Sequence, residues 1–362
     1  MTLPLREELK GIAAYGAPQI DVPVRLNTNE NPYSPPVELV DAIAGAMKNV
    51  APNFNRYPDR DAVELRTALA AYLTTEAGVS LSIEQVWAAN GSNEVMLQIL
   101  QAFGGPQHTA LTFVPTYSMY EEYARDTNTN FVSVNRLEDF SLTADLVVAA
   151  IAEHQPQVIF FASPNNPTGT AMDLSIVEAA CAAAPDAVVV VDEAYAEFRR
   201  EGVPSAVALL AKHPQLVVTR TMSKAFAFAG VRLGYLAASP ELIADLLLVR
   251  LPYHLSTVTQ TVALTAIKFA ESLQKDLGRI RSERDELVTW LRAQGYTAAD
   301  SDANFVLFGQ FSNRHATWQA LVDRGVLIRE VGPAGWLRVT VGTPEEMKIF
   351  KEALVDVKGL SQ

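Results

Sequence analysis

Four polar residues stand at or just after apolar runs in the middle of the chain: Lys224, Asp192, Tyr195 and Asn166. A lysine amine can condense with an aldehyde cofactor and can later be freed to move protons. An aspartate can keep a pyridine nitrogen protonated, so that the ring withdraws electrons from a bound substrate. Tyrosine and asparagine can hydrogen-bond the phenolic oxygen of such a cofactor and favour its ionised form. The set therefore predicts pyridoxal 5′-phosphate chemistry.

The phosphate of this cofactor needs hydrogen-bond donors of its own. A polar segment that contains a glycine lies between a strand-like run, residues 86–89, and a helix expected over residues 95–103. Free backbone N–H groups at a helix start attract an anion, and hydroxyl and guanidinium groups strengthen its binding. The candidate phosphate ligands are Gly91, Ser92, Asn93, Thr221, Ser223 and Arg232.

Two more residues are candidates because of their type and position. Tyr117 can stack on the face of a pyridine ring, although a lone tyrosine is at least as often a core residue. Arg338 lies inside an apolar run, residues 336–341, where a guanidinium needs an anion. We expect that anion to be a substrate carboxylate, with an internal salt bridge as the alternative.

The main candidates also have ordinary structural interpretations. Most lysines are solvated at the surface, so Lys224 can be one of these. Asp192 can cap a helix. The segment 163–169, which contains Asn166, has the composition of a simple turn. The catalytic interpretation is favoured because all these residues occur together at the ends of strand-like runs.

Composition limits the classes of partner. The chain has 362 residues, of which 49% are hydrophobic, and a formal net charge of −12. This charge disfavours nucleic acid and an anionic membrane surface as partners. The single cysteine, Cys181, excludes an intramolecular disulfide and lies in an alanine-rich segment typical of an apolar helix. We expect no signal peptide and no membrane-spanning segment, and predict a cytoplasmic protein.

Apolar runs that alternate with helical patterns predict an α/β fold. Several runs consist of successive Val, Ile or Phe residues, which favours a mainly parallel sheet between two layers of helices. The expected strands are residues 86–89, 109–113, 131–134, 158–162, 188–192, 216–221 and 234–238. Residues 61–64 have the pattern of a capping box that opens a helix, and Gly78 can end that helix. Ligands of such sheets bind at the carboxyl ends of the strands, where the polar candidates lie.

The chain is expected to divide into three parts. Residues 1–35 are rich in proline and are interpreted as an arm and a segment that joins a smaller domain. Residues 36–250 form the large α/β domain. Residues 251–362 form a smaller α+β domain, which contains a long helical stretch over 256–294 that can be bent or broken on the way. Its short strands are expected at residues 304–309, 326–328 and 336–341.

The whole chain resembles the fold-type I pyridoxal-phosphate aminotransferases of the aspartate aminotransferase superfamily. The resemblance is carried by the motifs LNTNENP (26–32), RYP (56–58), NGSNE (90–94), SPNNPTG (163–169), DEAY (192–195), TMSKAFAFAG (221–230) and LRVTVG (337–342). Within the superfamily the chain looks most like the histidinol-phosphate aminotransferases. The resemblance implies a seven-stranded, mainly parallel sheet in the large domain.

The resemblance also implies roles for the candidate residues. Lys224 binds the cofactor, Asp192 pairs with its ring nitrogen, and Tyr117 stacks on the ring. Asn166 and Tyr195 contact the phenolic oxygen. Residues 91–93 hold the phosphate with Ser223 and Arg232, although some relatives have an acidic residue at position 93. Arg338 takes a carboxylate of the substrate, of glutamate or of 2-oxoglutarate.

Two further expectations follow from the resemblance. Tyr57 reaches the cofactor phosphate of a neighbouring subunit, which implies a homodimer with shared active sites. Because histidinol phosphate carries a phosphate where glutamate carries a carboxylate, one site must accept both anions. The candidates for that dual site are Tyr15, Asn29, Arg329 and Arg338. A surface salt bridge with Glu330 or a nearby acid is an equal alternative for Arg329.

The implied reaction is a transamination in histidine biosynthesis. Glutamate and imidazole-acetol phosphate give 2-oxoglutarate and histidinol phosphate. An aromatic amino acid aminotransferase that acts on phenylalanine or tyrosine is the nearest alternative, and a threonine-phosphate decarboxylase is a more distant one. A further alternative is the non-catalytic, aminotransferase-like half of a transcription regulator, which normally carries a DNA-binding extension.

Overall fold

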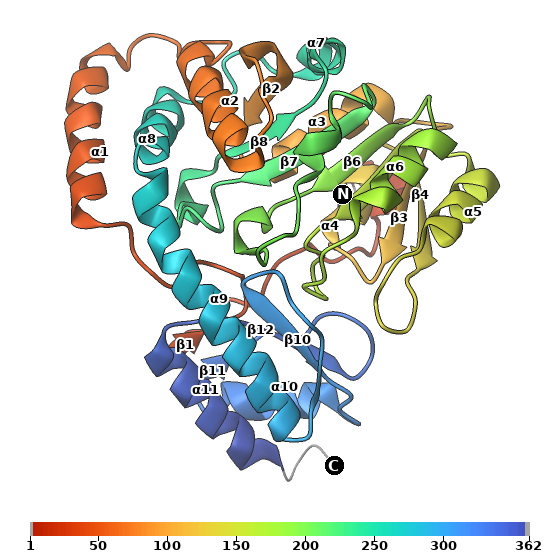
Figure 1. Cartoon of the computed structure of the whole chain (residues 1–362), viewed down its shortest axis with the longest axis vertical. Helices are drawn as coiled ribbons and strands as arrows, with labels where there is room; N and C mark the ends of the chain where they lie inside the picture. The colour runs from red at the N-terminus through yellow and green to blue at the C-terminus, as the bar shows by residue number, and fades with distance from the viewer. Residues whose placement is uncertain (1–2, 359–362) are drawn as a thin grey trace.

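A seven-stranded sheet with helices on both faces forms the larger part of the molecule, and a smaller sheet lies beneath it (Figure 1). The computed structural model describes residues 3–358. The strand order is β2-β8-β7-β6-β5-β3-β4; β8 runs antiparallel to both of its neighbours, and the other adjacent pairs are parallel. The strands are β2 (Val86–Ala89), β3 (Thr109–Val114), β4 (Asn130–Asn135), β5 (Val158–Ala162), β6 (Val188–Asp192), β7 (Leu216–Thr221) and β8 (Gly234–Ala237). The predicted α/β fold is confirmed, and each predicted strand end is correct to within one residue.

The central strands are buried on both faces, as their valine runs indicate. Along β6, Val189 and Val191 pack into one hydrophobic cluster, whereas Val188 and Val190 pack into the other. This alternation has the period of two residues that a strand imposes. The first cluster is covered by α2 (Val63–Ala77), α5 (Ala144–His154), α6 (Leu174–Ala183) and α8 (Thr257–Ile267). The second is covered by α3 (Ser92–Phe103), α4 (Met119–Asp126) and α7 (Pro240–Val249).

One predicted helix cap and one predicted helix start are wrong, although a helix does begin at Val63 as expected. The capping box at residues 61–64 does not form, because Ala62 is left-handed with φ 46° and Asp61 pairs with Arg60 and Arg250. Asp59 Oδ2 instead accepts a hydrogen bond from the N–H of Val63 at 2.7 Å. Helix α3 begins at Ser92, three residues before the predicted start. The predicted stop is correct, since Gly78 ends α2 in the left-handed conformation that glycine tolerates.

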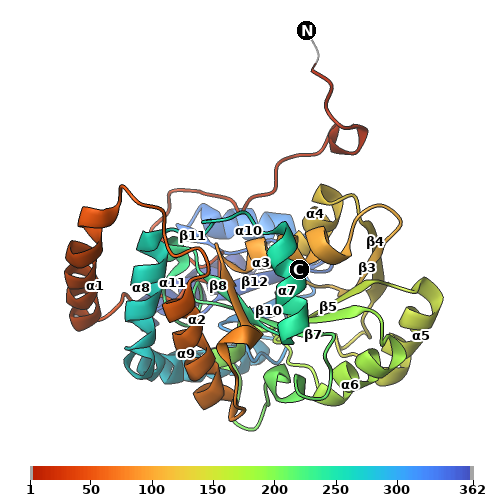
Figure 2. The ribbon, with the colours of Figure 1, turned by 90° about the horizontal axis from the view of Figure 1, so that it is seen from above.

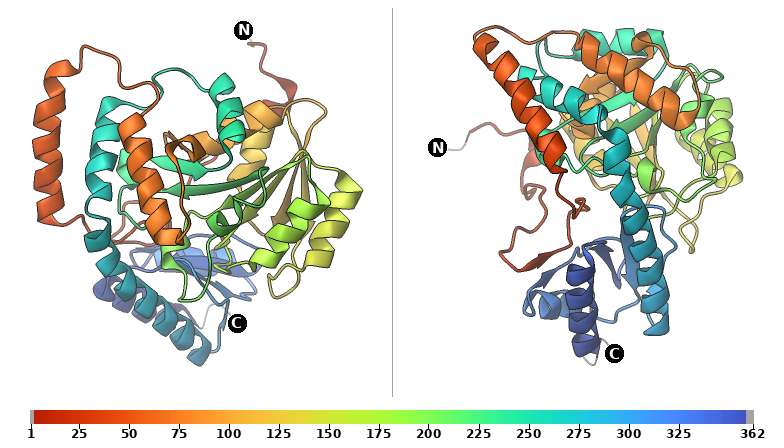
Figure 3. Two further views of the ribbon diagram at one scale, coloured as in Figure 1. Left: turned by 45° about the horizontal axis from the view of Figure 1, so that its top comes forward. Right: turned by 60° about the vertical axis from the view of Figure 1, so that its left-hand side comes forward.

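The predicted long helical stretch is two helices. Helix α8 ends at Ile267, and α9 (Ala270–Ala293) then runs down into the smaller unit (Figure 1; Figure 3, right). That unit has a three-stranded antiparallel sheet in the order β12-β10-β9. Its elements are β9 (Thr297–Ala298), β10 (Phe305–Gly309), α10 (Arg314–Val322), β11 (Val326–Leu327), β12 (Trp336–Thr340) and α11 (Pro344–Val357).

The N-terminal segment joins the smaller unit before it enters the larger one. Strand β1 (Val24–Arg25) pairs in parallel with β11. The part of the chain around η1 (Glu7–Leu9) projects away from the body (Figure 2). After β1, helix α1 (Val37–Val50) packs beside α8, and only Leu39 of α1 is fully buried. The short 3-10 helices are η1 (Glu7–Leu9), η2 (Ala51–Asn53), η3 (Ile83–Gln85), η4 (Ala196–Phe198), η5 (Ala206–Leu209) and η6 (Ala229–Val231). No helix within residues 3–358 has the length and apolar character needed to cross a membrane.

Candidate functional site

A cavity of about 410 Å³ opens at the carboxyl ends of β5, β6 and β7. It brings together residues that lie far apart in the sequence. Fourteen predicted site residues line it: Tyr15, Asn29, Ser92, Asn93, Tyr117, Asn166, Asp192, Tyr195, Thr221, Ser223, Lys224, Arg232, Arg329 and Arg338. Gly91 directly precedes the lining residue Ser92, and Tyr57 is not part of the lining.

The amine of Lys224 lies inside this cavity, so the interpretation as a solvated surface lysine is wrong. Its Nζ donates a hydrogen bond to the carbonyl oxygen of Thr28 at 2.8 Å. Burial, together with the positive charge of Arg338, lowers the pKa of this amine to about 8. A neutral amine is a nucleophile, which suits Lys224 to attack a carbonyl carbon.

Asp192 is the last residue of β6 and does not cap a helix. Its Oδ1 accepts hydrogen bonds from Thr219 Oγ1 at 3.1 Å and from the N–H of Ala194 at 3.2 Å. Its Oδ2 accepts from the hydroxyl of Tyr120 at 3.0 Å. Burial raises the pKa of this carboxyl to about 6, and these donors oppose the rise. A cationic partner in the cavity would keep the carboxylate ionised.

Tyr120 and Thr219 are functional candidates that the sequence analysis missed. Thr219 is the direct cross-strand partner of Asp192 in the β6–β7 register. Tyr120 comes from α4 on one face of the sheet. The register and the rotation of α4 place these hydroxyls, and neither is visible in a short sequence motif. Tyr120 lies only three residues after Tyr117, which was the available signal.

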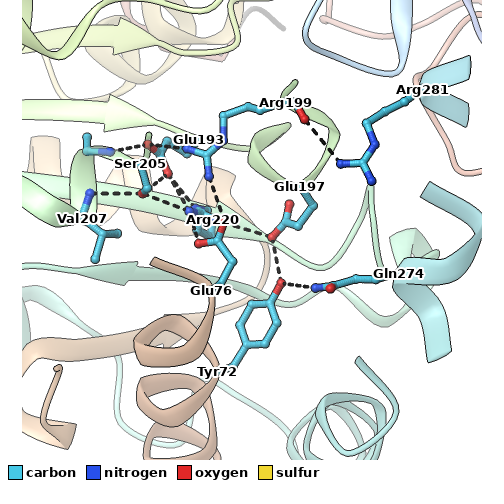
Figure 4. A network of polar contacts seen from close by, with 11 residues as sticks. Tyr72, Glu76, Glu193, Glu197, Arg199, Ser205, Val207, Arg220, Gln274 and Arg281 are labelled. Carbon is cyan, nitrogen blue, oxygen red and sulfur yellow. Dashed lines mark hydrogen bonds and ion pairs between the residues drawn. The ribbon is translucent and has the colours of Figure 1, made fainter. Parts of the chain in front are cut away.

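A buried charge cluster lies on the opposite side of β6 and β7 (Figure 4). Glu193 points there, as expected for the residue that follows Asp192 on a strand. Arg220 contacts Glu193, Glu197 and Glu76 at 2.7, 3.1 and 2.9 Å. Because Glu76 belongs to α2, the cluster joins the two central strands to a covering helix. It thereby fixes the strand ends that carry Asp192 and Thr219.

One wall of the cavity has the donors and the space for a phosphate. The N–H groups of Ser92 and Asn93 lie in the first turn of α3, where backbone donors have no partner within the helix. The hydroxyl of Ser223 accepts hydrogen bonds from Thr221 at 3.0 Å and from Arg232 at 3.4 Å. Among residues 3–358, Arg232 has no carboxylate within ion-pair distance. This wall therefore offers cationic and neutral donors to an anion.

Gly91 keeps this wall open. Its φ of +82° is one that residues with a Cβ rarely adopt. A Cβ at this position would lie 2.6 Å from Arg232 Nη2. The donor set and this close approach of backbone to guanidinium fit the phosphate of pyridoxal 5′-phosphate.

Arg338 is a buried cation without a carboxylate partner among the described residues, which argues against an internal salt bridge. Its guanidinium donates to Asn166 Oδ1 at 2.5 Å and to the carbonyl oxygen of Asn27 at 2.8 Å. Its Nε is buried with no partner in the described part of the chain. Burial lowers the pKa of Arg338 to about 10. Such a group is stabilised when an anion enters the cavity.

Arg329 lies beside Arg338, because the two residues form an isolated antiparallel bridge. Each backbone N–H donates to the other residue's carbonyl oxygen at 2.9 Å. Within residues 3–358, Nη1 of Arg329 is buried without a partner. Glu330 pairs with Arg314 and His315, so the alternative of an Arg329–Glu330 salt bridge is wrong. Two adjacent guanidiniums thus face the cavity.

The remaining cavity residues form short polar contacts. Asn29 Nδ2 donates to the hydroxyl of Tyr195 at 2.9 Å, and burial raises the pKa of that tyrosine. The hydroxyl of Tyr117 lies 3.5 Å from Asn93 Oδ1. Ser118 Oγ donates to the hydroxyl of Tyr15 at 3.3 Å. The N-terminal segment therefore contributes side chains to the same cavity as β6 and α3.

Tyr57 lies apart from the cavity of its own chain. Its side chain is 80% exposed, and its ring stacks on Tyr253 with the ring centres 4.6 Å apart. An exposed pair of aromatic rings is typical of a surface that contacts another protein.

Comparisons with known proteins agree on one family. The model of "Aminotransferase class I and II" matches residues 21–354. The chain is 63% identical to the histidinol-phosphate aminotransferase of Thermobifida fusca (strain YX), over 99% of this chain and 96% of the relative. It is 52% identical to the histidinol-phosphate aminotransferase of Mycolicibacterium smegmatis, over 99% of this chain and 94% of the relative. The crystal structure of the Sinorhizobium meliloti histidinol-phosphate aminotransferase with pyridoxal-5′-phosphate has a TM-score of 0.85 at 21% identity and 99% coverage of both chains.

Proposed function

Because the chain belongs to the class I and II aminotransferases, and among them to the histidinol-phosphate aminotransferases, we propose that it transfers an amino group between histidinol phosphate and 2-oxoglutarate. In the biosynthetic direction, glutamate and imidazole-acetol phosphate are the substrates in the making of histidine. One observation carries the proposal: the lysine amine with a lowered pKa shares its cavity with a buried carboxylate and with two arginines that have no carboxylate partner among residues 3–358.

The cofactor is pyridoxal 5′-phosphate, which when bound draws the electrons of the substrate's Cα–H bond into its ring. We assign its phosphate to residues 91–93, Thr221, Ser223 and Arg232. We assign its ring face to Tyr117. The donor-rich wall beside Gly91 and the place of Tyr117 in the lining of the cavity support these assignments.

Three residues carry the proposed proton and charge chemistry. Asp192 holds the proton of the ring nitrogen, which keeps the ring cationic. Lys224 binds the cofactor at rest and, once the substrate has displaced it, moves the proton at Cα. Tyr195 donates to the phenolic oxygen, with Asn166 as its second partner. The contact of Asn166 with Arg338 also links this oxygen to the substrate end of the cavity.

The adjacent guanidiniums of Arg329 and Arg338 explain how one site can serve two anions. Glutamate brings a carboxylate and histidinol phosphate brings a phosphate, and planar guanidiniums bind both in a bidentate manner. We propose that both anions bind here in alternate half-reactions, with Tyr15 and Asn29 as hydrogen-bonding neighbours. Each of the two arginines has a buried nitrogen without a hydrogen-bond partner in the described part of the chain, which supports this site.

We also propose a cytoplasmic homodimer in which Tyr57 completes the phosphate site of the partner subunit. The exposed side chain of Tyr57 and its distance from the cavity of its own chain favour this arrangement. Apolar side chains exposed on α1, among them Val37 and Val40, also suit a protein interface.

Steady-state kinetics test the substrate assignment. We expect kcat/KM for histidinol phosphate to exceed that for phenylalanine and for tyrosine, with 2-oxoglutarate as acceptor. A preference for phenylalanine would favour an aromatic aminotransferase. Release of carbon dioxide from threonine phosphate, without transamination of histidinol phosphate, would favour the decarboxylase.

A further inference from the structure

Tyr120 is a buried tyrosine whose hydroxyl meets the carboxylate of Asp192. Its ring is held on two sides. It stacks on Phe160 with ring centres 4.8 Å apart and an interplanar angle of 10°. It also meets the edge of Tyr117 with centres 5.6 Å apart and an angle of 89°. Packing therefore fixes the position of the hydroxyl, and the hydroxyl in turn acts on the carboxylate.

The hydrogen bonds of Asp192 are unevenly shared between its two oxygens. A carboxylate offers about four lone-pair positions, two on each oxygen. Oδ1 accepts from Thr219 and from the N–H of Ala194, which uses both of its positions. Oδ2 accepts from Tyr120, which uses one. The remaining position is therefore on Oδ2, the oxygen that Tyr120 holds.

We propose that Tyr120 is a positioning residue that sets the rotation of the Asp192 carboxylate, so that the free lone pair of Oδ2 meets the N–H of the cofactor ring. Thr219 is its counterpart on Oδ1. The inference rests on the proposed function, because that function requires a protonated ring nitrogen opposite Asp192. In this proposal the hydroxyls of Tyr120 and Thr219 orient the ion pair between Asp192 and the ring nitrogen, and that ion pair makes the ring an electron sink.

The same hydroxyl also favours the charged form of the carboxyl group. Burial raises the pKa of Asp192, the negative charge of Glu193 raises it further, and hydrogen bonds from Tyr120, Thr219 and Ala194 lower it. The other titratable groups that face Asp192 are Tyr117, Tyr123 and Tyr195. Burial raises the pKa of Tyr120 well above its usual value, so this hydroxyl remains a donor. Removal of the donor would therefore extend the neutral form of Asp192 to higher pH.

The variant Tyr120→Phe tests the inference because it removes one oxygen and keeps the ring. A hydrogen bond to a charged group contributes about 1.5–3 kcal/mol, so we expect the dissociation constant of pyridoxal 5′-phosphate from the apoenzyme to rise by about tenfold or more. We expect a similar fall in kcat, with KM for histidinol phosphate changed by less than about twofold. The acidic limb of the kcat–pH profile should move to higher pH.

Tyr235→Phe is the matched control. Tyr235 is also fully buried in the seven-stranded sheet, and its hydroxyl has no hydrogen-bond partner among the described residues. This variant should keep the wild-type cofactor affinity and pH profile. Thr219→Val tests the hydrogen bond to Oδ1 of Asp192 independently. It should shift the cofactor affinity and the pH profile in the same direction as Tyr120→Phe. Thr219→Ser, which keeps the hydroxyl, should restore them.

The inference is overturned if Tyr120→Phe matches Tyr235→Phe in cofactor affinity, kcat and pH profile. It is also overturned if Thr219→Val and Thr219→Ser behave alike. A wild-type protein that binds no pyridoxal 5′-phosphate would refute the proposed function together with the inference. Wild-type transaminase activity with an unchanged Tyr120→Phe variant would refute the inference alone.

Discussion

The amine of Lys224 and the carboxyl of Asp192 both have pKa values shifted toward neutrality by burial. The shift works against the charged form in each case, so burial extends the neutral lysine to lower pH and the neutral aspartic acid to higher pH. A bound pyridine nitrogen that carries a proton reverses this preference for Asp192. The cavity therefore becomes electrostatically complete only when a cation lies opposite that carboxylate.

Lys224→Ala should remove the visible absorption band of the covalently held cofactor. We expect kcat to fall by about 10²–10⁴-fold or more, since both the covalent link and the proton carrier are lost. Absorption spectra and steady-state kinetics measure the two effects. The control is Lys212→Ala, which changes an exposed lysine outside the cavity. Full activity of Lys224→Ala would show that the mechanism is wrong.

Asp192→Asn should separate stability from activity. The folded pKa of about 6 lies above the usual value of 3.8, so the carboxyl destabilises the apoenzyme as pH rises through this interval. Above that interval, the isosteric neutral variant should increase the free energy of unfolding by about 1–3 kcal/mol. Its kcat should nevertheless fall by about 100-fold or more, because the partner of the ring nitrogen is lost.

Urea unfolding of the two apoenzymes at pH 5 and pH 8 measures this difference. The gain should be larger at pH 8, where the wild-type carboxyl is ionised. A variant that is less stable than the wild type at pH 8 would contradict the assigned direction of the pKa shift.

Arg338→Met should raise the KM for glutamate and for histidinol phosphate by about tenfold or more, because a charged partner of both anions is lost. The affinity for pyridoxal 5′-phosphate should change little. Arg324→Met, at an exposed arginine of the same unit, is the control. An increase in KM for only one of the two substrates would argue against a shared anion site.

The residues that the sequence predicted are those whose role depends on local position. Lys224 and Asp192 follow or end apolar runs, and the carboxyl ends of parallel strands meet at one edge. Tyr120 and Thr219 could not be found in this way, since their contacts depend on register and helix rotation. Tyr15 and Arg329 reach the cavity only through the tertiary arrangement, and the resemblance to a family was needed to propose them.

At the scale of elements, the buried strands were the most predictable. The valine run of β6 allows few structures other than a strand covered on both faces. Helix α2 opens where it was expected, but its predicted capping box does not form because Asp61 is occupied by Arg60 and Arg250. Local sequence does not reveal such competition from distant residues. The pairing of β1 with β11 supports the proposal that residues 1–35 join the smaller domain.

The cluster around Arg220 predicts a large difference between two substitutions. Arg220→Met leaves the carboxylates of Glu76, Glu193 and Glu197 buried with insufficient positive charge, and should cost about 3–5 kcal/mol of stability. Glu197→Gln should cost much less, because burial already raises the pKa of Glu197 and disfavours its charge. Denaturant unfolding of the two variants measures the contrast. Equal losses of unfolding free energy in the two variants would show that the positive charge of Arg220 is not what stabilises the cluster.

At the scale of the whole molecule, the proposed dimer can be tested by mixing inactive subunits. If Tyr57 serves the partner's site, a hybrid of Lys224→Ala and Tyr57→Ala chains has one intact site. Random reassortment in a symmetric dimer should then restore about a quarter of wild-type activity. The control mixes Lys224→Ala with Asp192→Ala, which leaves no intact site. An absence of recovery in the first mixture would argue against shared sites.

The cavity draws on both ends of the chain, and this has a consequence for biosynthesis of the protein. The proposed cofactor wall comes from residues 91–232, whereas Arg329 and Arg338, the proposed anion site, come near the end of the chain. During translation, the part that holds the cofactor can therefore leave the ribosome before the part that recognises the substrate anions. A truncated product that stops before β12 would retain Lys224 and Asp192 but would lack Arg338, and it could not select its substrate.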